Sequence, residues 1–169
     1  MLASIGSRSV GLLCTFLMLS TAGCTIEQRT DRDTEPPPST RKQIIDVAGV
    51  ARLPVFSSAI RSGEFIFLSG QIGAVPGITP PTLVEGGIVP ETRQTLENIR
   101  QVLKTAGATM DDIVKCSVFI ADMADYAQVN EVYLEFFASD PPARSALGAN
   151  GLALGALVEI ECIAAVPEG

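Results

Sequence analysis

The alternation of residue types between positions 157 and 166 constrains the fold more than any other feature of the sequence. Apolar residues recur there at every second position: Val158, Ile160, Cys162 and Ala164. Glu159 and Glu161 fall between them. Because successive side chains of a strand point to opposite faces, this run predicts a strand with one face in a core and two carboxylates on the other. The pair suits the solvated face of an edge strand as well as a site that holds water or a ligand.

Two segments show the three- and four-residue spacing of amphipathic helices. The first begins near Pro90 and ends at Gly107, and its apolar positions are Leu96, Ile99, Val102, Leu103 and Ala106. Proline suits a first helical turn, and glycine suits the residue after a helix. The second begins near Ala124 and carries an apolar stripe: Tyr126, Val129, Val132, Tyr133, Phe136 and Phe137. We interpret this stripe as core packing rather than as a cofactor site.

Short apolar runs predict the remaining strands at residues 44–47, 53–60, 64–69 and 113–121, with a turn at 61–63. The continuous apolar run at 65–68 is typical of a strand buried on both faces. Residues 70–87, rich in proline and glycine, are predicted as a loop. The order is three strands, a helix, a strand, a helix and two final strands, of which residues 157–166 are the second. This order predicts an α/β (α+β) domain.

Residues 1–23 resemble a secretory signal peptide. One basic residue, Arg8, precedes a short apolar run at 10–19 that is too short to span a bilayer by itself. Small residues precede Cys24, as in the lipobox of bacterial lipoproteins, although Thr21 departs from the usual leucine. Cys24 is therefore the expected lipidation site. The alternative is a plain signal peptide with an incidental cysteine.

Residues 24–43 are polar, charged and proline-rich, which predicts a disordered tether rather than a packed element. The folded domain is then expected at 44–169, in the cell envelope. There it would be a membrane-anchored lipoprotein that faces the periplasm or the exterior, with the lipid anchor as its only contact with the membrane. A secreted protein is the alternative.

Two of the four cysteines, Cys116 and Cys162, belong to the predicted domain. Each lies in an apolar run, and around the first of them Val114, Cys116 and Val118 alternate with Lys115 and Ser117. This pattern favours buried free thiols. A disulfide is the alternative in an oxidising compartment, and the spacing does not decide between the two.

Composition excludes several kinds of chemistry. The chain has a formal charge of −7 and no run of basic residues, which argues against nucleic-acid binding because phosphates are neutralised by clustered lysine and arginine. It contains no histidine, so the commonest general base and metal ligand are missing. Any catalysis has to use carboxylates, hydroxyls, backbone groups, lysine, arginine or bound water, and we expect neither a metal nor a cofactor.

Arg144 lies in a stiff segment, Pro-Pro-Ala-Arg-Ser at 141–145. Prolines fix the backbone angle φ and remove amide donors. A planar guanidinium binds a carboxylate through two parallel hydrogen bonds. Arg144 is thus a candidate for binding a small acid, with an ordinary surface or ion-pair arginine as the alternative.

Several stretches together resemble the Rid family of reactive enamine/imine deaminases, also called the YjgF family. They are LPVFSSAI at 53–60, FLSGQIG at 67–73, QTLENI at 94–99, VNEVY at 129–133, PARS at 142–145 and VEIECIA at 158–164. The resemblance extends over residues 44–166. It implies a chorismate-mutase-like mixed sheet with two helices packed on one face. It also implies a homotrimer with clefts between neighbouring subunits.

The resemblance also implies roles for individual residues. Arg144 matches the arginine that binds the substrate carboxylate, and Glu159 matches the carboxylate that positions or activates water. Ser69 and Asn130 match residues that line the cleft. Phe56 stands where deaminating members usually carry a tyrosine, so one hydroxyl is missing, and Ala146 replaces a frequent cysteine.

The expected activity is hydrolysis of reactive 2-imino or enamine acids to 2-keto acids and ammonia. A trimer that binds small carboxylates without catalysis is the alternative, because it would keep Arg144 and needs no tyrosine at position 56. A different hydrolase that uses the same cleft is a third hypothesis.

Overall fold

The computed structural model describes residues 42–47, 54–137 and 139–166. The predicted signal peptide, Cys24 and all but the last two residues of the predicted tether lie outside these ranges. Within them, no helix combines the length and the apolar character needed to cross a membrane.

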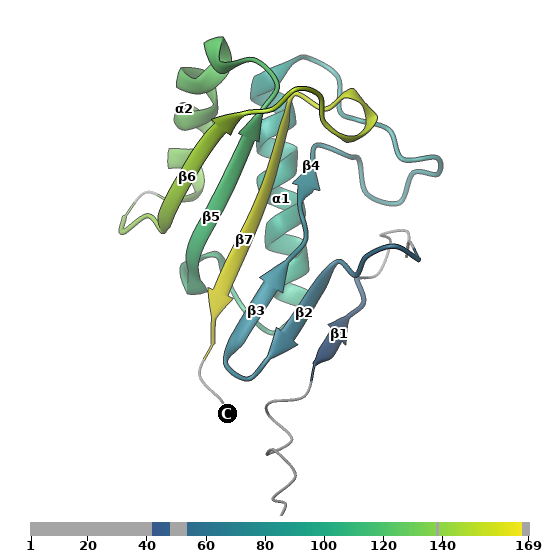
Figure 1. The fold of residues 1–169 in the computed structure, drawn as a ribbon, viewed down its shortest axis with the longest axis vertical. Coiled ribbons are helices and arrows are strands. Elements are labelled where there is room, and N and C mark those ends of the chain that lie inside the picture. The colour runs from purple at the N-terminus through teal and green to yellow at the C-terminus, as the bar shows by residue number, and fades with distance from the viewer. Residues whose placement is uncertain (1–41, 48–53, 138, 167–169) are drawn as a thin grey trace, which may run out of the picture. The chain divides into compact units, whose positions relative to one another are not determined.

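Seven strands form one mixed sheet (Figure 1). They are β1 (Gln43–Ile45), β2 (Ala59–Ser62), β3 (Phe65–Leu68), β4 (Gln71–Ile72), β5 (Ile113–Ile120), β6 (Ala143–Gly148) and β7 (Val158–Ala165). Their order is β1-β2-β3-β7-β5-β6, and β4 also pairs with β7. β5 and β6 are parallel and the other pairs are antiparallel. β6 is therefore an edge strand, and β7 is central.

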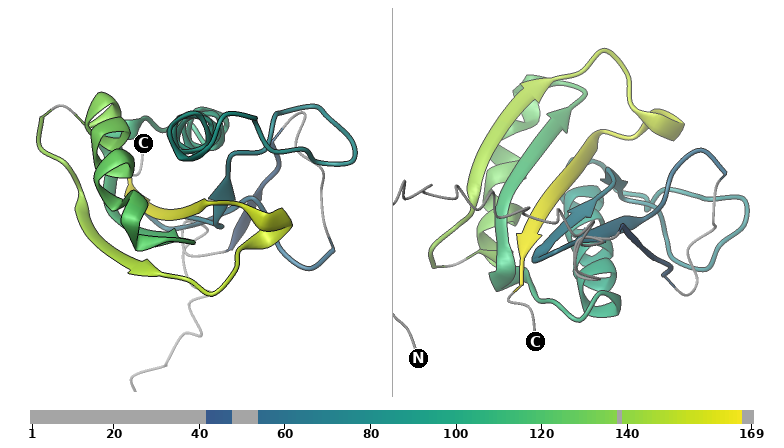
Figure 2. Two further views of the ribbon diagram at one scale, coloured as in Figure 1. Left: turned by 90° about the horizontal axis from the view of Figure 1, so that it is seen from above. Right: turned by 60° about the horizontal axis from the view of Figure 1, so that its bottom comes forward.

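Two helices, α1 (Ile88–Thr105) and α2 (Tyr126–Phe136), pack on the same face of the sheet (Figure 2). α1 has Pro90 in its first turn, where a missing amide hydrogen costs no helical bond. Gly107, just beyond its end, has a φ of 76°, which glycine adopts without steric strain. The predicted mixed sheet with two helices on one face is confirmed.

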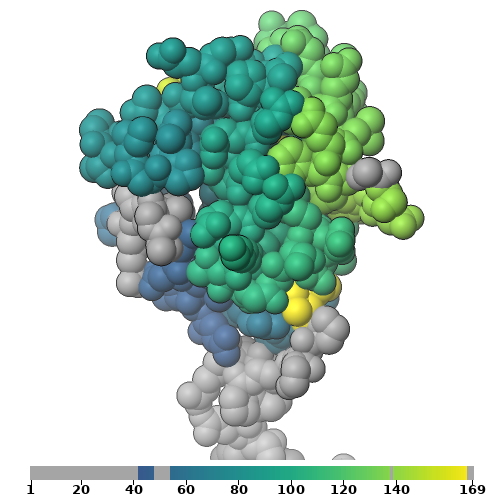
Figure 3. Space-filling view, turned by 180° about the vertical axis from the view of Figure 1, so that it is seen from behind, coloured from purple at the N-terminus to yellow at the C-terminus, as the bar shows by residue number. Residues whose placement is uncertain are grey.

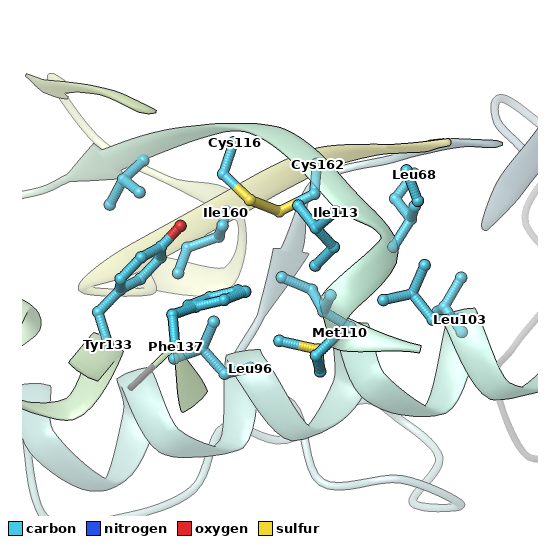
Figure 4. Packing of buried hydrophobic residues seen from close by; sticks show 14 of the residues in the cluster. Leu68, Leu96, Leu103, Met110, Ile113, Cys116, Tyr133, Phe137, Ile160 and Cys162 are labelled. Atoms are coloured by element: carbon cyan, nitrogen blue, oxygen red, sulfur yellow. A yellow bond between two sulfur atoms is a disulfide. The ribbon is translucent and has the colours of Figure 1, made fainter. Parts of the chain in front are cut away.

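The core lies between the helices and this face of the sheet (Figure 4). Side chains of α1 and α2 cover it when the molecule is viewed from behind (Figure 3). Fully buried residues come from both layers: Ile66, Val118, Ile120 and Ile160 from strands, and Leu96, Ile99, Val129 and Val132 from helices. Each contributes about 1.5–3 kcal/mol relative to an exposed side chain.

Among the described residues, no α-helix packs on the other face of the sheet, called the open face below. The prediction that residues 65–68 are buried on both faces is wrong for the single chain. Ile66 and Leu68 are buried, but Phe65 and Phe67 are 40% and 45% exposed. The physical reason is that both helices pack on one side, so no helix of the described part of the chain covers the alternate side chains of β3.

Strand register also differs from the expected pattern at two places. Val114 is 44% exposed because the pairing of β5 with β7 shifts between Ile113 and Lys115, so Val114 does not share the face of Cys116. The second predicted strand starts at Ala59 rather than at 53, and its turn lies two residues later. β4 falls within the segment predicted as a loop.

Cys116 and Cys162 form a disulfide between β5 and β7 (Figure 4), so the prediction of free thiols is wrong. The two residues are direct partners in the antiparallel register, with Cα atoms 4.1 Å apart and both side chains in the core. Sequence spacing carries no information on register, which is why it did not decide the pairing.

Candidate functional site

Arg144 projects from the edge strand β6 onto α2. Its Nη2 donates hydrogen bonds to Oδ1 of Asn130 at 2.7 Å and to the hydroxyl of Tyr126 at 3.2 Å. The guanidinium carbon lies 4.7 Å from the ring centroid of Tyr133 and 5.7 Å from that of Tyr126, within the range of cation–π attraction. We call Tyr126, Asn130, Tyr133 and Arg144 the arginine cluster.

Helix geometry explains why these side chains meet. Positions 126, 130 and 133 are four and three residues apart, so they share one side of α2. That side faces β6, where Arg144 alternates with the exposed Ala143 and Ser145. The structure thus brings together Arg144 and Asn130, two residues that the sequence predicted for the site.

The two tyrosines of the cluster have different environments. Tyr133 is 4% exposed, and its hydroxyl has no hydrogen-bond partner among the described residues. Burial raises the pKa of this hydroxyl to about 12, although the charge of Arg144 lowers it slightly. Tyr126 is 37% exposed, with its hydroxyl on the guanidinium. The sequence placed both in a core stripe, which is correct for Tyr133 and wrong for Tyr126.

Glu159 lies on β7 among residues of the open face. Its neighbours in the chain, Val158 and Ile160, are buried against the helices, so its carboxylate points the other way. Gly70 lies directly against it, since a Cβ at position 70 would overlap Oε1 of Glu159. Partial burial raises the pKa of Glu159, and the charge of Glu161 raises it further.

Ser69 precedes this glycine at the end of β3. Its hydroxyl donates a hydrogen bond of 2.7 Å to the carbonyl of Ser57, and its amide donates one of 3.0 Å to the carbonyl of Ser58. These bonds fix the segment that carries Phe56, which is 50% exposed. We call Ser69, Gly70 and Glu159 the glutamate cluster, and we include Phe56 because the segment that Ser69 holds carries it.

The two clusters lie on opposite faces of the sheet. Arg144 pairs with Cys116 in the register and contacts α2, on the helix-covered face. Glu159 pairs with Phe119 and belongs to the open face. A single chain therefore does not bring Arg144 and Glu159 together, and one ligand meets both only if two chains contribute.

A buried carboxylate that the sequence reading missed supports the glutamate cluster. Glu91 of α1 is 3% exposed, and its Oε1 accepts hydrogen bonds from the amides of Leu157 at 2.7 Å and Val158 at 3.4 Å. These two residues lead directly into Glu159. The sequence shows Glu91 as a glutamate in the first turn of a helix. Solvated glutamates are common at that position, so the sequence alone does not reveal that this one is buried.

Within the described ranges, no three histidine, cysteine, aspartate or glutamate side chains are grouped as metal ligands. The chemistry of these clusters is therefore that of a guanidinium, a carboxylate with a raised pKa, and hydroxyl groups. The guanidinium suits a ligand carboxylate, and Glu159 suits a water molecule.

Known proteins resemble this chain along most of its folded part. A family profile described as Endoribonuclease L-PSP matches residues 49–166. A Mus musculus protein named 2-iminobutanoate/2-iminopropanoate deaminase is 40% identical over 124 residues, which are 73% of this chain and 90% of the relative.

Two solved structures give the same result for the fold. The Yersinia pestis protein YyfA, of the conserved Rid protein family and of unknown function, is 39% identical with a TM-score of 0.69, over 75% of this chain and 100% of its own. Escherichia coli TdcF with bound serine is 33% identical with a TM-score of 0.66, over 73% and 98% of the two chains. With this sheet order, two helices on one face and these matches, the chain belongs to the Rid (YjgF, endoribonuclease L-PSP) family and has its chorismate-mutase-like fold.

Proposed function

We propose that this protein hydrolyses reactive 2-imino or enamine acids to 2-keto acids and ammonia. The observation that carries the proposal is the way in which neighbouring side chains hold the guanidinium of Arg144. Asn130 and Tyr126 both bind Nη2, and Tyr133 stacks on the guanidinium. The Nε and Nη1 donors have no hydrogen bond to the described residues, so they remain for a substrate carboxylate. The name of the mouse relative supports the same substrate class.

The site is proposed to form between copies of the chain in a homotrimer. Arg144 and Glu159 lie on opposite faces, so a complete site takes one cluster from each of two neighbours. Arg144 lies on an edge strand, where it is accessible to a second copy. The open face exposes large apolar side chains, Phe65, Phe67 and Leu147, as expected of a surface that another subunit covers.

In this cleft Arg144 would hold the substrate carboxylate and orient the C=N carbon, a proximity effect. Glu159 would accept a proton from a water molecule as its oxygen attacks that carbon. The raised pKa of Glu159 brings it closer to that of an effective general base. Glu159 would return this proton to the imine nitrogen, which gives an amino alcohol. A second proton would pass from the new hydroxyl group to the nitrogen as the C–N bond breaks, so that ammonia leaves and the C=O bond of the keto acid forms. The imine carbon is already electrophilic, so the barrier is modest.

A trimer that binds small carboxylates without turnover is the second candidate function. Phe56 favours it, because the resemblance to deaminating members implies a tyrosine at this position, and this chain lacks its hydroxyl. The structure of TdcF with bound serine shows that a relative binds a small amino acid. RNA cleavage, to which the name of the family profile refers, suits this chain poorly because it has a net charge of −7 and no histidine.

Arg144→Ala tests the assigned role of the guanidinium. We expect it to lower both imine hydrolysis and the affinity for 2-oxobutanoate by at least about 100-fold, because a charge-assisted contact to the substrate is lost. Sedimentation should still show a trimer, since a side chain and not a packing surface is removed. Retained activity in this variant would refute the role of Arg144.

We further propose that the protein is a lipoprotein anchored through Cys24 and displayed in the cell envelope. The buried disulfide supports an oxidising compartment. Cys24→Ala should move the protein from the membrane fraction to the soluble fraction of cells, because the lipidated residue is lost. A variant that stays with the membranes would count against the anchor.

A further inference from the structure

The chain contains two tyrosines, Tyr126 and Tyr133, and both contact the same guanidinium. This count matters because Phe56 stands where the family resemblance implies a tyrosine, so the proposed site lacks a phenol hydroxyl at that position. If a phenol takes part in binding the substrate, it has to come from one of these two residues.

Tyr133 does not suit this role. Its side chain is 4% exposed, and its hydroxyl is buried without a partner among the described residues, in the core cluster that also contains Cys116 and Cys162 (Figure 4). Only its ring reaches Arg144, as a surface on which the guanidinium stacks. A substrate bound to the guanidinium would therefore not contact the hydroxyl of Tyr133.

Tyr126, in contrast to Tyr133, presents its hydroxyl to Arg144 rather than to the core. It is 37% exposed at the start of α2, and its hydroxyl oxygen lies 3.2 Å from Nη2 of Arg144. A guanidinium only donates hydrogen bonds, so the phenol oxygen is the acceptor in this pair. The proton of the hydroxyl has no acceptor among the described residues and is available to a ligand.

A ligand carboxylate at Arg144 would supply that acceptor. It carries two oxygens with about four sites for hydrogen bonds, more than one guanidinium edge uses. Asn130 accepts from Nη2 through its Oδ1, so its Nδ2 is a second neutral donor beside the same guanidinium. The Tyr126 hydroxyl lies 3.2 Å from Nη2 of the guanidinium, so a carboxylate bound by Arg144 would be within reach of its proton.

From this arrangement we propose that Tyr126 is a substrate-binding residue. Its hydroxyl donates a hydrogen bond to the carboxylate of the 2-imino or 2-keto acid that Arg144 holds, and so replaces the phenol missing at Phe56. The inference rests on the proposed function for its substrate class. The proposed hydrogen bond to the carboxylate does not depend on whether the protein turns the ligand over.

Tyr126→Phe in the full chain tests the proposal, because it removes one hydroxyl and keeps the ring. Calorimetry measures the affinity for 2-oxobutanoate, and timed keto-acid formation measures kcat and KM. A hydrogen bond from a neutral donor to a carboxylate predicts affinity that is weaker by about 10- to 100-fold and a KM that rises in the same proportion. Circular dichroism confirms that the variant is folded.

Thr105→Val is the matched control. It exchanges a hydroxyl for a methyl group on the exposed end of α1. Among the described residues, this hydroxyl bonds only the carbonyl of Gln101, so the exchange should change neither affinity nor KM. If the wild-type protein binds 2-oxobutanoate and Tyr126→Phe binds it within twofold, the inference is overturned while the proposed function stands. A wild type that binds but does not turn over, with weaker binding in Tyr126→Phe, supports the inference and refutes the deaminase. A wild type that neither binds nor turns over refutes both.

Discussion

At the scale of single residues, Glu159 combines a proposed functional role with a cost in stability. Partial burial, and then the charge of Glu161, raise the pKa of its carboxyl group above the ordinary value of 4.5. The folded chain therefore binds this proton more tightly than the unfolded chain does. The stabilisation from Glu159 is complete below the unfolded pKa and is lost as the pH rises through the higher folded pKa.

Glu159→Gln is accordingly expected to raise the midpoint of thermal unfolding at neutral pH and to abolish imine hydrolysis. The gain should disappear at about pH 4, where the wild-type carboxyl group is itself mostly protonated. Because the chain carries a charge of −7, Glu64→Gln in an exposed turn serves as the control for the loss of one negative charge. A lower midpoint than wild type at neutral pH would contradict the account of Glu159.

Residues of the arginine cluster differ in how well the sequence predicted them. Arg144 and Asn130 were found through motifs in a fixed order along the chain. Tyr126 was not, because its spacing continues the apolar stripe of α2, and a period of 3.6 residues does not show where a stripe leaves the core. The contact with Arg144 depends on the position of β6, which the helix pattern does not contain.

At the scale of elements, the break between β3 and β4 positions the glutamate cluster. Both strands pair with β7, and Ser69 and Gly70 join them where Glu159 rises from the open face. The sequence predicted the long elements well, since α1, α2, β5 and β7 each have a sustained period. It did not predict β4, which has two residues, or the shift beside Val114, because neither leaves a periodic signal.

Gly70→Ala should displace the carboxylate of Glu159, because the added Cβ would overlap its Oε1. The far end of a flexible side chain is able to move, so we expect a loss of at least about tenfold in kcat with little change in the urea midpoint. Gly148→Ala, on β6, is the matched control, because it adds the same methyl group beside the flexible side chain of Met123. Full activity in Gly70→Ala would argue against a role for this contact.

At the scale of the whole molecule, the sheet separates the two halves of the proposed site. The arginine cluster lies under α2 at the edge, and the glutamate cluster lies on the open face. Residue patterns predicted candidate side chains for a site, but only the strand order and register show that one chain keeps Arg144 and Glu159 apart. The same holds for Cys116 and Cys162, whose pairing follows from the register of β5 with β7.

Imine hydrolysis by the wild-type protein is the most direct test of the central claim. An amino-acid oxidase generates the 2-imino acid in solution, and the formation of the 2-keto acid is timed with and without the purified protein. We predict that the protein accelerates keto-acid formation well above the rate in buffer and that Arg144→Ala does not. A rate equal to that in buffer, from a wild-type protein that still binds 2-oxobutanoate, would contradict the deaminase and leave a carboxylate-binding protein.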